Sequence, residues 1–135
     1  MPIERINPAG LAPPVMGLYT HVTVATGTRH VEISGQVALD ADGNLVGAGD
    51  HATQARQAFT NLRLALESVG GTGLDLVRYT ISVVDHGPEL IEPIFAAGAA
   101  VFADAWPQCS SMLVGVESLG LPDGLVENEG TAVLP

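Results

Sequence analysis

The chain contains no lysine, and its basic residues are five arginines: Arg5, Arg29, Arg56, Arg63 and Arg78. This absence excludes Schiff-base chemistry on a lysine amine and a phosphate-binding loop built around a lysine. Fifteen acidic residues outnumber the five arginines and bring the formal net charge to −10 at pH 7. Because nucleic-acid binding depends on cationic contacts to phosphates, this balance argues against a nucleic-acid partner.

Cysteine and long apolar segments are scarce too. The single cysteine, Cys109, excludes an intrachain disulfide framework and a zinc site built from several cysteines. Residues 6–28 carry no formal charge, but prolines interrupt them, so they do not predict a membrane-spanning helix. Glu4 and Arg5 have no apolar segment behind them, unlike a signal peptide. We therefore expect a soluble, cytoplasmic protein without a membrane partner.

The length of 135 residues, or 13.9 kDa, predicts a single domain over residues 1–135. Residues 1–15 contain several prolines and predict an extended lead-in to that domain. Apolar residues make up 47% of the chain and charged residues 15%, which is a globular composition. The surplus of apolar residues predicts apolar surface for subunit contacts, and therefore an oligomer.

Two segments near the start alternate in the manner of β-strands. They cover residues 19–25 and 29–34, and Gly27-Thr28 lies between them. Two alternating segments joined by a short glycine-containing turn predict a β-hairpin. A second turn is predicted at residues 40–44, which read Asp-Ala-Asp-Gly-Asn.

The clearest helix is predicted over residues 51–69, where apolar side chains recur at steps of three and four. Asp50 is well placed as an N-cap, and Gly70-Gly71 is a typical C-terminal stop. Arg63 and Glu67 are spaced to form an ion pair on the outer side of this helix.

A proline affects the second helix, which is predicted from about residue 88 to residue 102. Pro93 does not fit the interior of a helix, so the helix either starts late, near Glu92, or is kinked. Three further strands are predicted at residues 76–84, 110–116 and 125–134. The β-β-α-β-α-β-β order predicts an α+β domain whose two helices cover one face of a single sheet.

A few side chains have the chemistry of a functional site, each with a simpler interpretation beside it. His30 and Glu32 share a strand face, but without a third metal ligand they fit two surface side chains. Glu127 and Glu129 also share a face, either as solvated carboxylates or as groups that orient water or accept a proton. Cys109 has no histidine beside it in the sequence, so an inert buried thiol competes with a nucleophile.

The first two residues support a different class of enzyme. Removal of Met1 would expose the secondary amine of Pro2, and tautomerases that begin this way use that amine as a base. Proline is also a common second residue, so the tautomerase hypothesis rests on this feature alone.

Several segments, taken together and in order, resemble the Rid family of RidA/YjgF-like proteins from about residue 15 to the end. They are Gly17-Leu-Tyr19, Ile33-Ser-Gly-Gln36, Gln54-Ala-Arg-Gln57 with Asn61-Leu62, Val77-Arg-Tyr-Thr-Ile-Ser-Val-Val-Asp85 and Leu125-Val-Glu-Asn-Glu-Gly-Thr-Ala-Val133. The resemblance implies a chorismate-mutase-like α+β fold with one mixed sheet. It also implies a homotrimer with a central barrel and a ligand cleft at each subunit interface. The activity it implies is hydrolysis of enamines and imines such as 2-iminobutanoate, without a metal or organic cofactor.

Residue by residue, Tyr19 and Gly35 match cleft positions of the family, and Glu129 matches its C-terminal glutamate. In active members an arginine on the fifth strand holds the substrate carboxylate, which suits the forked geometry of a guanidinium. Here that position is Cys109 in an alignment on Pro107, or Ser111 in an alignment on the following strand. We prefer Ser111, because strand register decides which side chains face the cleft. No arginine occurs after Arg78 in either case.

The missing arginine decides which ligands we expect. A charge-assisted contact to a carboxylate is worth roughly 1.5–3 kcal/mol, or about ten- to a hundredfold in affinity. We therefore expect a neutral or cationic small molecule as ligand, hydrolysed as an enamine, an imine or a related compound. A genuine imine deaminase with a substituted anchor and a non-catalytic binding or chaperone-like module are the alternatives. Endoribonuclease activity is not expected, because the chain is acidic.

Overall fold

The computed structural model describes residues 3–135, which contain six strands and two α-helices. In chain order these are β1 (Ile3–Ile6), β2 (Val22–Ala25), β3 (Arg29–Gln36), α1 (His51–Glu67), β4 (Leu76–Val84), α2 (Ile91–Phe102), β5 (Ser110–Val116) and β6 (Val126–Leu134). Short 3₁₀ turns occur at Val15–Gly17, Gly73–Asp75, Pro88–Leu90 and Ala103–Ala105. Within the described residues, neither helix is long and apolar enough to cross a membrane.

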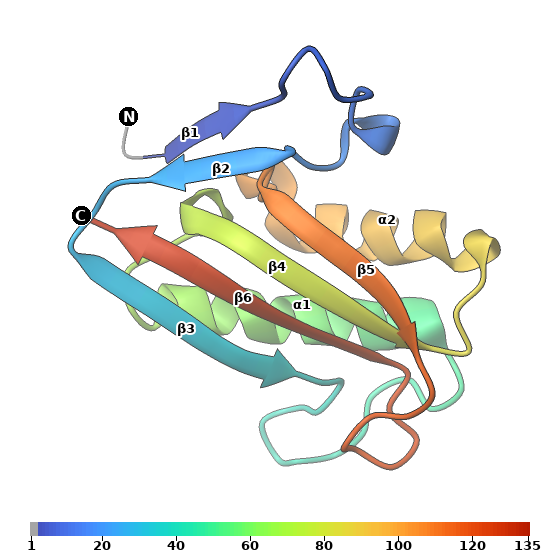
Figure 1. Ribbon diagram of the computed structural model, residues 1–135. Helices are drawn as coiled ribbons and strands as arrows, with labels where there is room; N and C mark the ends of the chain where they lie inside the picture. Colours follow the sequence, from blue (N-terminus) through green and yellow to red (C-terminus); the bar gives the residue numbers. More distant parts are fainter. Residues whose placement is uncertain (1–2) are drawn as a thin grey trace.

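Four of the strands form one mixed sheet in the order β3-β6-β4-β5. β6 runs antiparallel to β3 and to β4, whereas β4 and β5 are parallel and are connected through α2. Both helices pack on the same face of this sheet, and the opposite face is open (Figure 1). This arrangement confirms the α+β fold with two helices on one face of a mixed sheet.

The prediction that residues 19–25 and 29–34 form a β-hairpin is wrong. β2 pairs antiparallel with β1, so that Ile3 lies opposite Ala25, while β3 pairs with β6 on the far edge of the main sheet. Figure 1 shows β1 and β2 as a separate ribbon along one end of the sheet. Between β2 and β3, Gly27 passes so close to the backbone of Leu134 that a Cβ would lie 2.5 Å from its carbonyl oxygen. The glycine therefore lets the chain cross the end of β6 instead of turning back on itself.

Both predicted helices are confirmed, and of the two alternatives for the second helix, the late start is the one observed. The N-cap residue Asp50 accepts hydrogen bonds from the backbone N–H (3.2 Å) and the hydroxyl (2.8 Å) of Thr53, which lower the pKa of its carboxyl. The Arg63–Glu67 ion pair is present at 3.2 Å. α2 starts late, at Ile91, so Pro93 lies in the first turn, where a missing N–H removes no helical hydrogen bond.

Strand β6 has one buried face and one outward face. Val126, Asn128 and Gly130 are buried, whereas Glu127 is half-buried and Glu129 is exposed. Because successive side chains of a strand point to opposite faces, the two glutamates share the open face of the sheet, as predicted. This alternation puts charge on the open face and packs apolar side chains against the helices.

Candidate functional site

A cavity of about 400 Å³ lies on the helix side of β5, between the start of α2 and the N-terminal segment. Its lining residues are Val15, Met16, Leu18, Tyr19, His86, Ile91, Phe95, Ser111 and Leu113. The volume falls within the range of roughly 300–1,000 Å³ that is common for ligand pockets. Among the described residues that line it, none is an aspartate, glutamate or arginine. The cavity is therefore mainly apolar, with a few polar groups and no fixed charge.

Strand β5 places its cavity residues by alternation. Ser111 and Leu113 line the cavity, whereas Met112 between them points to the open face and is 47% exposed. Ser111 pairs in register with Tyr79 of β4, whose hydroxyl is buried without a hydrogen-bond partner in the described chain. Burial raises the pKa of Tyr79 above its usual value, and the Ser111 hydroxyl opposes this shift. Neither Ser111 nor the Tyr79 phenol paired beside it contributes a charge at neutral pH.

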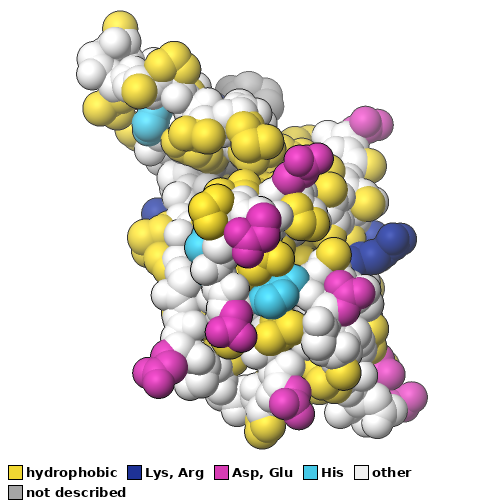
Figure 2. Space-filling model, turned by 90° about the vertical axis from the view of Figure 1, so that its right-hand side faces the viewer, with side chains coloured by type: hydrophobic (Ala, Val, Ile, Leu, Met, Phe, Trp, Pro, Cys, Tyr) yellow, Lys and Arg dark blue, Asp and Glu magenta, His cyan; other side chains and the backbone are white. Residues whose placement is uncertain are grey.

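Two side chains hold the N-terminal segment over the cavity. The Gln108 side-chain amide donates to the backbone oxygens of Gly17 (2.7 Å) and Tyr19 (3.0 Å). The Trp106 indole donates to the backbone oxygen of Leu18 at 3.1 Å. The segment itself is apolar at its tip, with Met16 65% exposed. Figure 2 shows hydrophobic side chains gathered on a protruding lobe, and acidic side chains scattered over the surface below it.

His86 is a cavity residue that the sequence analysis missed. It comes directly after Asp85, whose φ of 53° ends β4 in a left-handed turn. In the sequence it is one of four dispersed histidines, and nothing local connects it to Ser111, 25 positions away in the chain. The parallel pairing of β4 and β5 brings the end of one strand beside the other, and only that pairing reveals that His86 and Ser111 line one cavity.

Cys109 lies just before β5 and is fully buried. Burial raises the pKa of its thiol to about 12, although the guanidinium groups of Arg5 and Arg78 act in the opposite direction. A thiol with this pKa is protonated at neutral pH and is a weak nucleophile. This geometry favours the inert thiol over the nucleophile.

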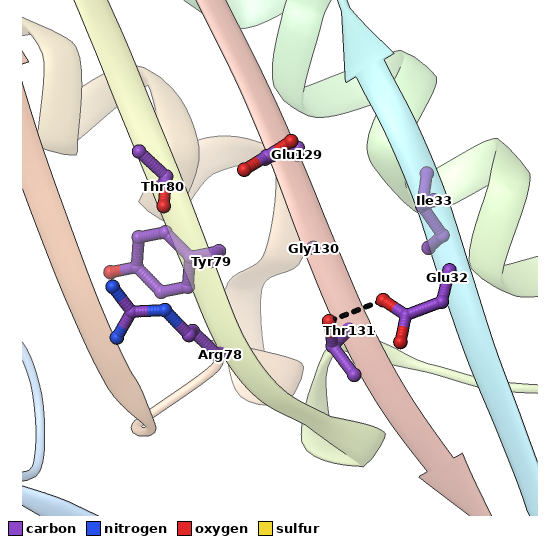
Figure 3. Close-up of a pocket in the computed structure, with 8 residues that line it drawn as sticks. All are labelled: Glu32, Ile33, Arg78, Tyr79, Thr80, Glu129, Gly130 and Thr131. Atoms are coloured by element: carbon purple, nitrogen blue, oxygen red, sulfur yellow. Dashed lines mark hydrogen bonds between the residues drawn. The ribbon is translucent and has the colours of Figure 1, made fainter.

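The open face of the sheet carries a second, smaller hollow of about 100 Å³ (Figure 3). It is lined by Glu32 of β3, Arg78 and Thr80 of β4, and Glu129 and Thr131 of β6, with neighbouring backbone. The Thr131 hydroxyl donates to the Glu32 carboxylate at 2.7 Å. This hollow therefore combines two carboxylates and one guanidinium, in contrast to the uncharged cavity.

Gly35 lies at the end of β3, away from the cavity. A Cβ at this position would collide with the Glu127 carboxylate, so the absence of a side chain lets that carboxylate lie against β3. Gly35 also borders a third hollow of about 490 Å³, next to Gln57 and Asn61 of α1. Asn61 donates to the backbone oxygens of Val37 and Leu39, both at 2.9 Å, and so holds the loop that follows β3.

The predicted site residues therefore lie in three separate places in the chain. Tyr19 and Ser111 line the same cavity, and Cys109 lies buried on the same side of the sheet. Glu129 lies on the open face, and Gly35 borders a separate hollow. Pro2, the basis of the tautomerase hypothesis, lies outside the described residues.

Comparison with known proteins identifies relatives that match nearly the whole chain. A family model described as Endoribonuclease L-PSP matches residues 10–134. YyfB from Yersinia pestis, a protein of unknown function of the conserved Rid protein family, is 36% identical with a TM-score of 0.91, over 99% of this chain and 100% of that chain. RidA from an Antarctic Psychrobacter is 26% identical with a TM-score of 0.67, over 91% of this chain and 94% of that chain. A member of the YjgF/YER057c/UK114 family from Mycobacterium tuberculosis shares the fold, with 24% identity and a TM-score of 0.61, over 98% of this chain and 99% of that chain.

Proposed function

Since the chain belongs to the endoribonuclease L-PSP family, which includes the Rid and YjgF proteins, we propose that it is a small-molecule hydrolase and not a ribonuclease. The observation that carries this proposal is the 400 Å³ cavity lined by Tyr19 and Ser111, two positions that resemble the Rid ligand cleft. The net charge of −10 makes binding of a polyanionic RNA unfavourable. A small molecule enclosed by apolar walls fits both features.

The active unit in this proposal is a homotrimer, as in the trimeric Rid proteins that the sequence resembles. Within one subunit, Glu129 and the cavity lie on opposite faces of the sheet, so a neighbouring copy must complete the cleft. The open face also exposes apolar area, including Met112 at 47% exposure, which a barrel of three sheets would cover. Light scattering should give three times the subunit mass of 13.9 kDa. A mass of one subunit at micromolar concentration would contradict the trimer.

The proposed reaction is the addition of water to a C=N bond. Glu129 takes a proton from water as the water oxygen bonds to the imine carbon; the π electron pair of the C=N bond moves to the nitrogen, and Glu129 returns the proton to that nitrogen. The resulting carbinolamine then loses ammonia and leaves a carbonyl compound. The hydroxyls of Tyr19 and Ser111 hold the substrate, and the backbone at Gly35 of the neighbouring subunit borders it. Every atom comes from the substrate and water, so the scheme needs no metal or organic cofactor.

The substrate in this proposal is not a standard α-imino acid. Ser111 and Cys109, the two positions that match the family's carboxylate-binding arginine, carry no charge at neutral pH. An anionic substrate would therefore lose its hydration in the cavity without gaining a cationic partner. A neutral or cationic enamine or imine avoids this cost.

One observation favours a second candidate, a genuine imine deaminase with a different anchor. Arg78 lines the same open-face hollow as Glu129, and although its guanidinium is directed toward β5 in Figure 3, another rotamer could hold a carboxylate beside β6. A coupled assay that generates 2-iminobutanoate separates the two candidates. Our first proposal predicts turnover far below that of an arginine-containing homologue measured in parallel. Equal turnover, lost in Arg78→Gln, would support the second candidate, and no turnover of any imine would indicate a binding module.

A further inference from the structure

We propose that His86 is the polar recognition group of the cavity and that the cavity excludes anions and takes a ligand with a neutral hydrogen-bonding end, such as a carboxamide or an enol. This inference rests on the proposed function, because it takes the cavity as the ligand cleft. It adds a residue that the resemblance does not provide and a defined ligand class.

Packing against strand β5 determines where the His86 side chain lies. Its side chain lies against Gly115 of β5, where a Cβ would approach the His86 Cβ to 3.3 Å. A larger residue at Gly115 would push the imidazole away from the strand. Gly115 belongs to the same side of β5 as Ser111 and Leu113, since the three positions differ by steps of two. The absence of a side chain at Gly115 therefore lets the His86 imidazole lie at one end of the cavity wall.

The hydrogen bonding of His86 sets it apart from two other histidines of the chain. His21 bonds the backbone oxygen of Ala12 at 2.6 Å, and His51 bonds that of Val84 at 2.7 Å, so both fix local structure. The Nδ1 atom of His86 is buried and has no hydrogen-bond partner among residues 3–135. A buried polar atom without a partner destabilises the protein, and native structures rarely leave one without a reason. His86 also lines the cavity, so a ligand bound there can engage its imidazole.

The chemistry of the walls defines the ligand. A neutral imidazole offers one donor and one acceptor, which match the carbonyl and N–H of an amide or the two oxygens of a hydroxycarbonyl compound. Ser111 adds a hydroxyl that can donate or accept, and Phe95 with Ile91 supplies an apolar surface for the rest of the molecule. Because no arginine is among the described lining residues, an anionic group would be desolvated there without a cationic partner. The cavity therefore discriminates against anions.

Two probes of the same shape test this selection: benzamide and benzoate. Each is titrated into the intact protein at pH 8, above the range in which histidine usually titrates, in 150 mM salt. Backbone NMR shifts of Ser111 and Leu113 report binding in the cavity. We expect benzamide to bind about tenfold or more tightly than benzoate, the cost of desolvating an anion without a cationic partner. Tighter binding of benzoate at these residues would overturn the ligand class.

Variants of His86 test the residue itself. His86→Phe keeps a ring of similar shape without nitrogen atoms and should weaken benzamide binding about tenfold. His86→Asn restores a donor and an acceptor and should recover part of that loss. The matched control is His30→Phe, at an exposed histidine on β3, which should leave binding unchanged. Unchanged benzamide affinity in His86→Phe would refute the role of His86.

The outcomes distinguish this inference from the proposed function. If neither probe shifts Ser111 or Leu113, the cavity is not a ligand cleft and both proposals fail. If an imine substrate is hydrolysed with full activity in His86→Phe, the inference fails while the proposed function stands. If benzamide binds through His86 but no imine is hydrolysed, the recognition site stands and the protein is a binding module.

Discussion

The helix-side cavity and the open face of the sheet are built from the same strands, yet they differ completely in charge. The cavity takes Ser111 and Leu113 from β5 and contains no fixed charge among its described lining residues. The open-face hollow takes Arg78 from β4 and Glu129 from β6. Strand alternation sorts the side chains in this way, because neighbours in the sequence point to opposite faces. In our proposal, the ligand cavity and the candidate base therefore lie on opposite faces of one chain, so a reaction that uses both needs more than one copy.

The largest expected effect comes from removing the base on the open face. Glu129→Gln keeps the shape of the side chain and removes its charge, and should lower hydrolysis of a confirmed substrate by roughly 10²–10⁴-fold. Steady-state kinetics measure the loss, and light scattering checks that the oligomer is intact. Glu127→Gln on the same face is the matched control and should be milder. Full activity in Glu129→Gln would make that residue structural and remove the chemical role of the open face.

A charge added to the cavity should make it resemble the open face. Ser111→Arg introduces a guanidinium on the cavity wall and should strengthen benzoate binding by about ten- to a hundredfold, the usual range of a charge-assisted contact. NMR titration of wild type and variant measures the change. Cys109→Arg tests the alternative register. Because Cys109 is 0% exposed, this variant should unfold at lower temperature. If instead it is stable and gains benzoate affinity, our preferred register is wrong.

The buried thiol on the cavity side predicts a loss of stability in alkali. Its pKa rises to about 12 in the folded protein, well above that of an unfolded cysteine at about 8.5. The free energy of unfolding should therefore be fully retained below about pH 8.5 and should fall as the pH rises toward 12, by roughly 1.4 kcal/mol per unit at most. Urea unfolding between pH 8 and pH 10 measures the slope. Cys109→Ala should flatten it, and an equal slope in that variant would assign the effect to other groups.

The smallest effect is expected for the stability of a variant on the buried face of β6, compared with a variant at the adjacent position on the open face. Asn128 faces the helices, is 1% exposed, and has both side-chain polar atoms buried without partners in the described chain. Asn128→Val should raise the free energy of unfolding by about 1 kcal/mol, because an unsatisfied polar group is replaced by an apolar one. Thermal unfolding measures the gain, with the exposed substitution Glu129→Gln as the unchanged reference. A lower melting temperature in Asn128→Val would show that the amide is satisfied in solution.

Local signals in the sequence were sufficient to predict most helices and strands, but not to predict which strands pair. The helix over residues 51–67 follows from its apolar spacing and from Asp50, and both act within a few residues. The hairpin prediction failed because alternation marks a strand but does not name its partner. The partner of β2 is β1, whose four residues are too few to give a periodic pattern.

Some residues of the candidate site could also be identified from the sequence, whereas another required the fold. Tyr19, Ser111 and Glu129 were identified from their resemblance to family positions, and the equal spacing of Glu127 and Glu129 placed both on one face. His86 could not be identified in this way, since it lines one cavity with Ser111 and Phe95 only through the parallel pairing of β4 and β5. The placement of Glu129 opposite the cavity also required the fold.

By itself, the sequence determined the acidic charge, the absence of lysine, the two helices, the positions of most strands and the family. These properties depend on composition, on short-range periodicity or on matching segments. The tertiary structure alone decided which strands pair, that Cys109 is buried, that the cavity is uncharged and that His86 belongs to it. Those features arise from contacts between residues far apart in the chain, which hydrophobic packing and strand register bring together only in the folded protein.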